Sequence, residues 1–187
     1  MPGSSFGVLI ENYLLGQLKS EVVFLHCLSD KNSIMGDTRI FNTSKNIALV
    51  AHDNKKADLI AWAETNKAVL SKHKLIATGT TGKMLEEKLK VPVQKLFSGP
   101  LGGDQQVGSM IAEGDIDMIV FFWDPMEAQP HDSDVKALLR LAVAWNILMA
   151  CNRTTADFIL TSKLMNEDYA LSVPDFSTYL QRNIGKK

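Results

Sequence analysis

Five short apolar runs, each followed by a polar or glycine-rich segment, constrain this chain more than any other feature of its sequence. The run Asn46–Ala51 carries successive apolar residues without alternation, which is typical of a strand covered on both faces of a parallel sheet. The predicted strands are Asn46–Ala51, Lys74–Ala77, Val93–Phe97, Met118–Phe122 and Ile147–Cys151. Strands that alternate with helices predict βαβ units with right-handed crossovers. The expected fold class is therefore α/β, with three α/β/α layers around a five-stranded, mainly parallel sheet.

The helices between these strands are predicted from apolar residues spaced three and four apart. Their stripes are Leu59, Ile60 and Ala63; Met84, Leu85 and Leu89; Val107, Met110 and Ile111; and, within a helix over Asp132–Trp145, Val135, Leu138, Leu139 and Ala142. The tail over 172–187 is expected to close with a short helix. Before the first strand, residues 8–18 fit an amphipathic helix, residues 21–28 a strand or buried run, and residues 29–45 a polar, turn-like segment.

Composition excludes several classes of partner and compartment. The chain has 187 residues and a formal net charge of −1, which gives no field for nucleic acid or an anionic membrane. No apolar run reaches membrane-spanning length, and the first residues lack the basic region and cleavage site of a signal peptide. Cys27 and Cys151 lie far apart, which favours a reducing compartment over a disulfide scaffold. We therefore expect a cytoplasmic protein.

The polar segments after the strands are expected to form one site, because ligands of such folds bind beyond the carboxyl ends of the strands. They cover residues 52–56, 78–82, 98–104 and 123–134. Four segments that lie far apart in the sequence are therefore expected to converge on one site, and any anion there must be held by local groups.

The segment Ser98–Gly108 reads SGPLGGDQQVG, and its glycines and proline mark a shaped turn that leads into a helix. Asp104 stands at the helix start, where an aspartate is ordinarily an N-cap. The loop is unusually elaborate for a cap, so we favour a catalytic carboxylate. Ser98 and the unhindered N–H of Gly99 form a potential anion contact.

Thr78–Gly82 opens another helix, where backbone N–H groups, the helix dipole and hydroxyl donors suit a phosphate. A threonine cap with glycine packing is the alternative. Lys56 and His52 could reach the same anion, with Asp53 beside them, but from these residues alone we favour a solvated polar turn.

The fourth segment presents His131 on a loop that two prolines rigidify, and Asp134 stands where a carboxylate could fix the tautomer of that histidine. Asp132 is read as a helix cap. The histidines show no metal-binding spacing, and a site for a hard metal ion from His52–Asp53 and His131–Asp134 is not favoured. We expect no cofactor.

These motifs, in the order in which they occur along the chain, resemble those of the methylglyoxal synthase family over residues 46–180. The matching stretches are ATGTTG, SGPLGGDQQVG, the His-Asp pair with a following lysine, and WDP followed by PHDSDVKALLR. Members of this family are lyases with a flavodoxin-like α/β fold that convert dihydroxyacetone phosphate into methylglyoxal and inorganic phosphate, and they need no metal. They are typically homohexamers, and some respond to phosphate, although no matching arginine can be placed in the tail here.

The resemblance implies roles for the site residues. Asp104 would be the base, His131 would face the substrate carbonyl, and Asp134 would act as a supporting acid. Asp53 and Asp124 would support the site. Substrate contacts would come from His52, Lys56, Thr78, Gly79, Thr80, Thr81, Ser98, Gly99 and His131.

Two further expectations concern the N-terminal residues and an alternative function. The resemblance does not cover residues 1–44, so the predicted domain is 45–187. Our hypothesis is that Met35 is the functional start, in which case the residues before it are a mis-called or dispensable extension. An added packing or regulatory element is the other interpretation. A non-catalytic phosphate-binding regulatory module of the same fold is the alternative function, but such a module would not need both Asp104 and His131.

Overall fold

The chain alternates strands and helices as its apolar pattern predicts. The computed structural model describes residues 38–126 and 132–180. The strands are β1 (Thr38–Phe41), β2 (Asn46–Ala51), β3 (Lys74–Ala77), β4 (Val93–Lys95), β5 (Met118–Phe122), β6 (Leu148–Ala150) and β7 (Tyr169–Ser172). The α-helices are α2 (Lys56–Thr65), α3 (Lys67–Leu70), α4 (Gly79–Leu89), α5 (Gly103–Ala112), α6 (Asp132–Ala144), α7 (Arg153–Thr161) and α8 (Ser177–Leu180). Short 3₁₀ helices cover Asp53–Lys55 (η1), Gly99–Leu101 (η2) and Lys163–Asn166 (η3).

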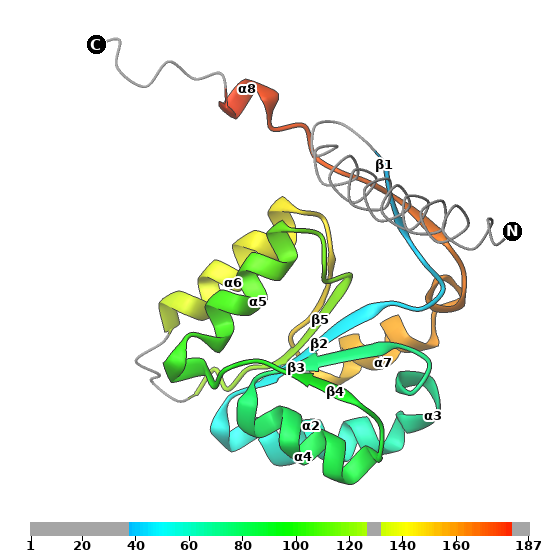
Figure 1. Cartoon of the computed structure of the whole chain (residues 1–187), viewed down its shortest axis with the longest axis vertical. Helices are drawn as coiled ribbons and strands as arrows, with labels where there is room; N and C mark the ends of the chain where they lie inside the picture. Colours follow the sequence, from blue (N-terminus) through cyan, green and yellow to red (C-terminus); the bar gives the residue numbers. More distant parts are fainter. Residues whose placement is uncertain (1–37, 127–131, 181–187) are drawn as a thin grey trace, which may run out of the picture. The chain divides into compact units, whose positions relative to one another are not determined.

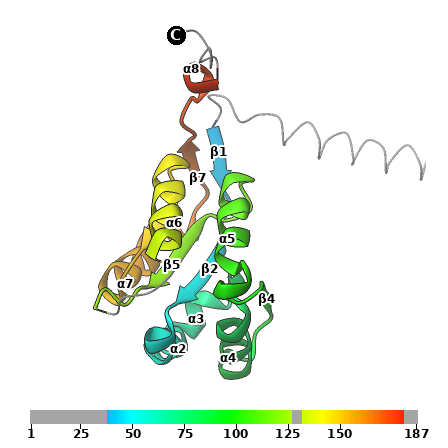
Figure 2. The same cartoon turned by 90° about the vertical axis from the view of Figure 1, so that its left-hand side faces the viewer.

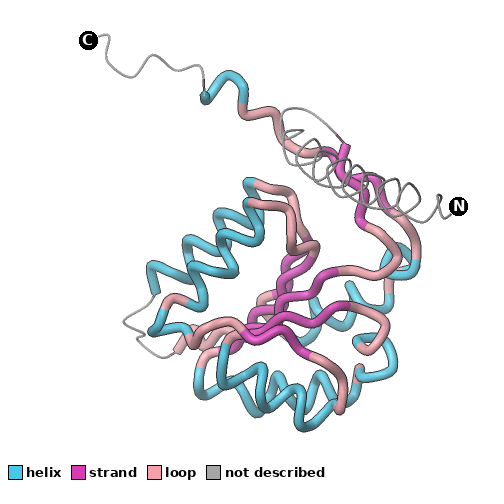
Figure 3. The backbone as a smooth tube through the Cα atoms, in the orientation of Figure 1, coloured by secondary structure: helices cyan, strands magenta, loops and turns pink. Residues whose placement is uncertain are grey.

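Residues Thr38–Pro174 form one compact unit around a parallel sheet in the order β4-β3-β2-β5-β6. The chain runs outward from β2 through β3 to β4, then returns to the other side of β2 with β5 and β6. This order places a topological switch point between β2 and β5, where Ala51 pairs with Phe122 at the carboxyl ends. The strands fan through the middle of the unit with helices on both sides (Figure 3). The predicted three-layer α/β fold is confirmed.

The core lies in two apolar layers, one on each face of the sheet. Ile47 and Leu49 of β2 face the layer completed by α2, α4 and α7, whereas Ala48 and Val50 face the layer completed by α5 and α6. Figure 1 shows α5 and α6 together on one face and α2 with α4 on the other, and Figure 2 shows the same grouping from the side. This two-sided burial explains why β2 carries no polar alternation.

Several boundaries and faces differ from the sequence predictions. β4 ends at Lys95 and β6 spans only Leu148–Ala150, so both outer strands are shorter than predicted. On α2, Leu59 and Ala63 are fully buried as predicted, whereas Ile60 is only partly buried. Trp62, which the predicted stripe did not include, is also fully buried; its ring lies against Phe122 and its indole N–H donates to the Asp157 carboxylate at 2.7 Å. The tail does form the short helix α8.

The expectation that residues 29–45 are turn-like is wrong for Thr38–Phe41. These residues form β1, which pairs antiparallel with β7, a strand that no sequence signal predicted. The pairing is long-range, and a short half-exposed ribbon of this kind has little periodicity of its own. The predicted helix over 8–18, the apolar run over 21–28 and Met35 lie outside the described residues.

A buried carboxylate ties β1 to the amino ends of β2 and β5. Asp117 accepts hydrogen bonds from the Asn46 N–H at 2.7 Å and from the Arg39 guanidinium at 2.5 Å. Burial raises the pKa of Asp117, while the Asn46 N–H and the charge of Arg39 act in the opposite direction. Lys45 is likewise buried, and its Nζ donates to the carbonyls of Asn42 and Glu167.

We predict that Asp117→Ala lowers the free energy of unfolding by about 2 to 3 kcal/mol, because it leaves a buried N–H and the guanidinium without their acceptor. Asp117→Asn keeps an acceptor for Asn46 and is expected to lose less. Urea denaturation measures both. The control is Glu64→Ala, which removes a half-exposed pair with Lys88 and should cost under about 0.5 kcal/mol. Equal losses in Asp117→Ala and Glu64→Ala would contradict this account.

A second prediction concerns pH. The Nδ1 of His73 accepts the Lys45 N–H at 3.1 Å, and burial, reinforced by Lys45 and Lys72, lowers the pKa of His73 below its ordinary 6.5. The unfolded chain therefore binds this proton more readily, so the contribution is complete above pH 6.5 and is lost as the pH falls through the interval down to the folded-state pKa.

We expect the free energy of unfolding to decrease with acidification in that interval, and the decrease to be smaller in His73→Asn, whose amide oxygen can replace Nδ1 as acceptor. Denaturation curves at several pH values measure the effect. Identical pH slopes in the two proteins would show that His73 is not the titrating group.

Candidate active site

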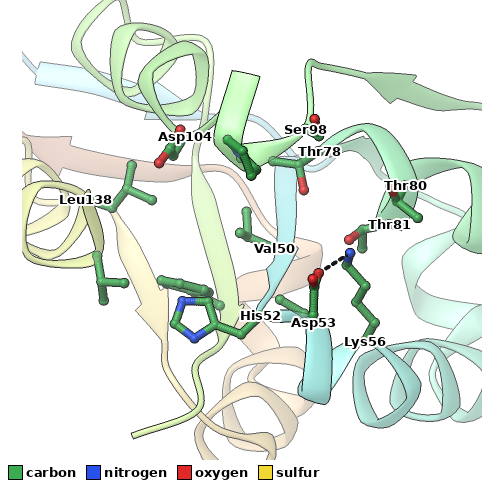
Figure 4. Close-up of a pocket in the computed structure, with 15 residues that line it drawn as sticks. Val50, His52, Asp53, Lys56, Thr78, Thr80, Thr81, Ser98, Asp104 and Leu138 are labelled. Atoms are coloured by element: carbon green, nitrogen blue, oxygen red, sulfur yellow. Dashed lines mark hydrogen bonds and ion pairs between the residues drawn. The ribbon is translucent and has the colours of Figure 1, made fainter. Parts of the chain in front are cut away.

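A cavity of about 330 Å³ opens at the carboxyl edge of the sheet, beside the switch point between β2 and β5. It is lined by Val50, Ala51, His52, Asp53, Lys56, Thr78, Thr80, Thr81, Ser98, Gly99, Pro100, Asp104, Phe121, Val135 and Leu138. The cavity joins residues 52–56, 78–81 and 98–104, so three of the four predicted segments do meet. Figure 4 shows Asp104 at one end of the cavity and Lys56 with Thr81 at the other.

The turn at the start of α4 presents hydroxyl groups to the cavity. Thr78 occupies the N-cap position, but its side chain makes no capping hydrogen bond, so it does not act as the threonine cap that the sequence also allowed. Thr81 is fully buried, and its Oγ1 has no hydrogen-bond partner among the described residues. A buried hydroxyl without a partner is costly, and a ligand oxygen in the cavity would satisfy it.

The two glycines of this turn, Gly79 and Gly82, allow close packing against neighbouring segments. Gly79 does not line the cavity, and its N–H donates to the Phe97 carbonyl at 3.1 Å. A Cβ on Gly82 would lie 2.8 Å from the Cγ of Lys95, so this glycine lets α4 approach β4. The two glycines of the turn therefore allow close packing, while its threonines Thr78, Thr80 and Thr81 line the cavity.

Lys56 supplies a cation from the first residue of α2. Its Nζ donates to the Asp53 carboxylate at 2.5 Å, and this hydrogen bond, with the charge of Lys56, lowers the pKa of Asp53 (Figure 4). The lysine side chain is 22% exposed and the aspartate 87% exposed. The aspartate of this pair is therefore exposed to solvent, and Lys56 can donate further hydrogen bonds from its ammonium group to an anion in the cavity.

His52 is oriented by the neighbouring strand. Its Nδ1 accepts the backbone N–H of Asp124 at 3.3 Å, and its ring meets Phe121 edge-on with centroids 5.2 Å apart. Because Nδ1 is an acceptor here, a neutral ring carries its proton on Nε2. His52 is thereby prepared to donate from Nε2. Asp124 contributes its backbone rather than lining the cavity.

The glycine-rich loop places Asp104 in the first turn of α5. The loop forms η2, and the helix N-cap is Gly102, whose φ of +94° lies in the left-handed region that favours glycine. Asp104 is therefore not the cap. Gly103 allows the closest approach: a Cβ there would lie 2.0 Å from the Phe97 carbonyl oxygen.

Residues 123–126, the part of the fourth predicted segment whose side chains the structure describes, do not line the cavity, but helix α6 directly after the segment does. Val135 and Leu138 of α6 line the cavity opposite the loops. His131 lies outside the described residues, and the structure describes no side chain for Asp134. Across residues 38–126 and 132–180, no group of three or more His, Cys, Asp or Glu side chains lies close enough together to bind a metal ion. The helices described over the same residues are too short or too polar to span a membrane.

The sequence analysis missed the apolar wall of the cavity. Val50, Ala51, Phe121, Val135 and Leu138 were interpreted only as core, yet each also faces the cavity. A usable signal existed, because the last residues of strands that run to the carboxyl edge must border any site there. An apolar wall matters chemically, since it limits water around the polar groups.

Comparison with known proteins agrees with this geometry. The family model described as the MGS-like domain matches residues 58–151, so fold and site define a domain of this class. The methylglyoxal synthase of Sodalis glossinidius is 55% identical over 147 residues, covering 79% of this chain and 96% of its own. That of Hahella chejuensis is 56% identical, covering 74% and 90%. The crystal structure of methylglyoxal synthase from Elizabethkingia anophelis superposes with a TM-score of 0.76 at 58% identity, covering 81% and 99%.

The chain belongs to the methylglyoxal synthase family, which is a family of lyases.

Proposed function

We propose that this chain converts dihydroxyacetone phosphate into methylglyoxal and inorganic phosphate in the cavity at the carboxyl edge of the sheet. The observation that carries the proposal is the division of the cavity into two ends. Lys56 and the unsatisfied hydroxyl of Thr81 lie at one end, and the carboxylate of Asp104 lies at the other. A small phosphate ester with a carbonyl in its middle fits that division.

The phosphate end would hold a dianion without a metal. Thr78, Thr80, Thr81 and Ser98 offer hydroxyl groups, Gly99 offers a backbone N–H, and Lys56 offers a charge-assisted donor. Gly79 would support the turn through its bond to Phe97 rather than touch the ligand. The same donors that bind the substrate would stabilise the phosphate as it leaves.

The carboxylate end would start the reaction. Asp104 would remove a proton from the hydroxymethyl carbon, and the electrons of that C–H bond would move to the carbonyl oxygen to give an enediolate. Collapse of the enediolate would break the C–O bond to phosphate. The remaining enol would take a proton on its terminal carbon to become methylglyoxal.

Donors near the carbonyl oxygen would stabilise the enediolate. The Nε2–H of His52 is one, given the tautomer that the Asp124 N–H imposes. His131 is proposed as the second on the family resemblance, with Asp134 and Asp124 in support. Asp53 would hold Lys56 in place between turnovers.

Further proposals rest on the family resemblance. They are a homohexameric assembly, inorganic phosphate as effector as well as product, a cytoplasmic location in a bypass of glycolysis, and residues 1–44 as an extension before a domain over 45–187, with β1 of that extension packed on the domain through β7. Native mass and phosphate dependence of the rate would test the first two.

We predict that Thr81→Val weakens binding of inorganic phosphate about tenfold without lowering the free energy of unfolding. The hydroxyl bonds nothing in the described protein, so the isosteric valine removes only a ligand contact worth roughly 1.4 kcal/mol. Calorimetric titration and urea denaturation measure the two quantities.

The matched control is Thr65→Val on α2, whose hydroxyl donates to the Ala61 carbonyl away from the cavity. It should leave phosphate affinity unchanged. If Thr81→Val binds phosphate as well as the wild type, the phosphate end of the cavity has been placed wrongly.

We predict that Asp104→Asn lowers kcat at least ~100-fold, the lower range for loss of a general base, while phosphate affinity stays within a few-fold. The assay measures the methylglyoxal and phosphate released from added dihydroxyacetone phosphate, and the wild type is expected to give equal yields of the two. Asp115→Asn, an exposed aspartate beyond the far end of α5, is the control and should retain full rate. Near-normal turnover by Asp104→Asn would refute the assignment, and phosphate binding without turnover by the wild type would indicate a regulatory module.

A further inference from the structure

The backbone N–H and carbonyl of Phe97 join the two loops that form the polar part of the cavity. Its carbonyl accepts the Gly79 N–H at 3.1 Å, which ties it to the start of α4, and its own N–H donates to the Gln106 side chain on α5 at 2.8 Å. The Phe97 side chain does not fix this position, because it is 62% exposed. The backbone bonds therefore hold the junction.

Gln106 supplies a bond that the sheet cannot. β4 is an outer strand, and the chain pairs with β3 only as far as the Leu96 N–H, which donates to the Ala77 carbonyl at 2.9 Å. The next amide, that of Phe97, points to the side of β4 where the described part of the chain places no strand. The Oε1 of Gln106 takes that place, and it must be the amide oxygen because the partner is an N–H donor.

The same helix turn carries Asp104. Gly102, Gly103 and Asp104 lie between Phe97 and Gln106 in the chain, and the Gly103 N–H donates to the Ser98 carbonyl at 3.0 Å. The side-chain bond therefore closes a ring from the end of β4, through the glycine loop, to the first turn of α5. A change at Gln106 would let the helix start move relative to Ser98 and the α4 turn.

We propose that Gln106 is a positioning residue that sets the distance between Asp104 and the phosphate end of the cavity. The inference rests on the proposed function, since it assumes that Asp104 reacts with a ligand whose phosphate lies near Thr81. Gln106 touches no reacting atom and acts through the Phe97 backbone. Displacements of about 1 Å in a reacting group cost up to ~100-fold in rate, so a modest shift is enough to be measured.

Two variants separate the bond from the bulk of the side chain. Gln106→Met keeps the length but removes the acceptor, and Gln106→Glu keeps an acceptor oxygen. Gln94→Met, the same substitution at an exposed site on β4, is the matched control. For each we would measure kcat and KM with dihydroxyacetone phosphate, affinity for inorganic phosphate, thermal unfolding, and hydrogen exchange of the Phe97 amide.

Gln106→Met is expected to lower kcat roughly 10- to 100-fold, to change phosphate affinity less than about threefold, and to speed exchange of the Phe97 amide at least about tenfold. Gln106→Glu is expected to stay within about threefold of the wild type in kcat and to keep that amide protected. Gln94→Met should match the wild type throughout.

The proposal is overturned if Gln106→Met retains full kcat, or if Gln106→Glu loses kcat while the Phe97 amide stays protected. The second result remains decisive if the methionine variant unfolds. Failure of the proposed function is a separate outcome: the wild type itself would then release no methylglyoxal, while exchange of the Phe97 amide would still report whether Gln106 holds the loop.

Discussion

The pairing of β2 with β5 is the constraint on which the rest of this structure depends. Its parallel register runs from Ile47 opposite Met118 to Ala51 opposite Phe122, and it is where the chain changes direction across the sheet. The next residue after β2, His52, continues the contact by donating its N–H to the Phe122 carbonyl. The Asp124 N–H then returns a bond to the His52 ring. One strand pair thus positions both the sheet and the first polar group of the cavity.

The two edges of the sheet use buried polar groups differently. At the amino edge, Asp117 and Lys45 find protein acceptors or donors, and their bonds join β1 and the segment after α7 to the core. Two buried side-chain atoms have no partner among the described residues: the Nε2 of His73, beside Lys45, and the Oγ1 of Thr81, which lines the cavity at the carboxyl edge. Paired groups contribute to stability, whereas an unpaired one in a cavity costs stability and is best explained by a ligand. Of the two unpaired atoms, the Thr81 hydroxyl is the one that lines the cavity beside the switch point, which supports the proposal of a ligand there.

Much of this arrangement follows from the sequence, because apolar periodicity and the positions of glycine report local structure directly. The five strands of the sheet and the meeting of residues 52–56, 78–81 and 98–104 were predictable in that way. β1 and β7 were not, since each is stabilised by a partner far away in the chain. The unsatisfied Thr81 hydroxyl and the bond from Gln106 to Phe97 were also beyond reach, because residue types do not reveal which polar atoms lack or gain a partner.

The most direct test of the account is a crystal structure with 2-phosphoglycolate, which carries a phosphate and a carboxylate in place of the enediolate oxygens. The account predicts phosphate oxygens within hydrogen-bond distance of the Thr81 Oγ1 and the Lys56 Nζ, with the ligand carboxyl group beside Asp104 and one proton shared between these two carboxyl groups. Phosphate bound beside Asp104 instead, or outside the cavity at the switch point, would contradict it.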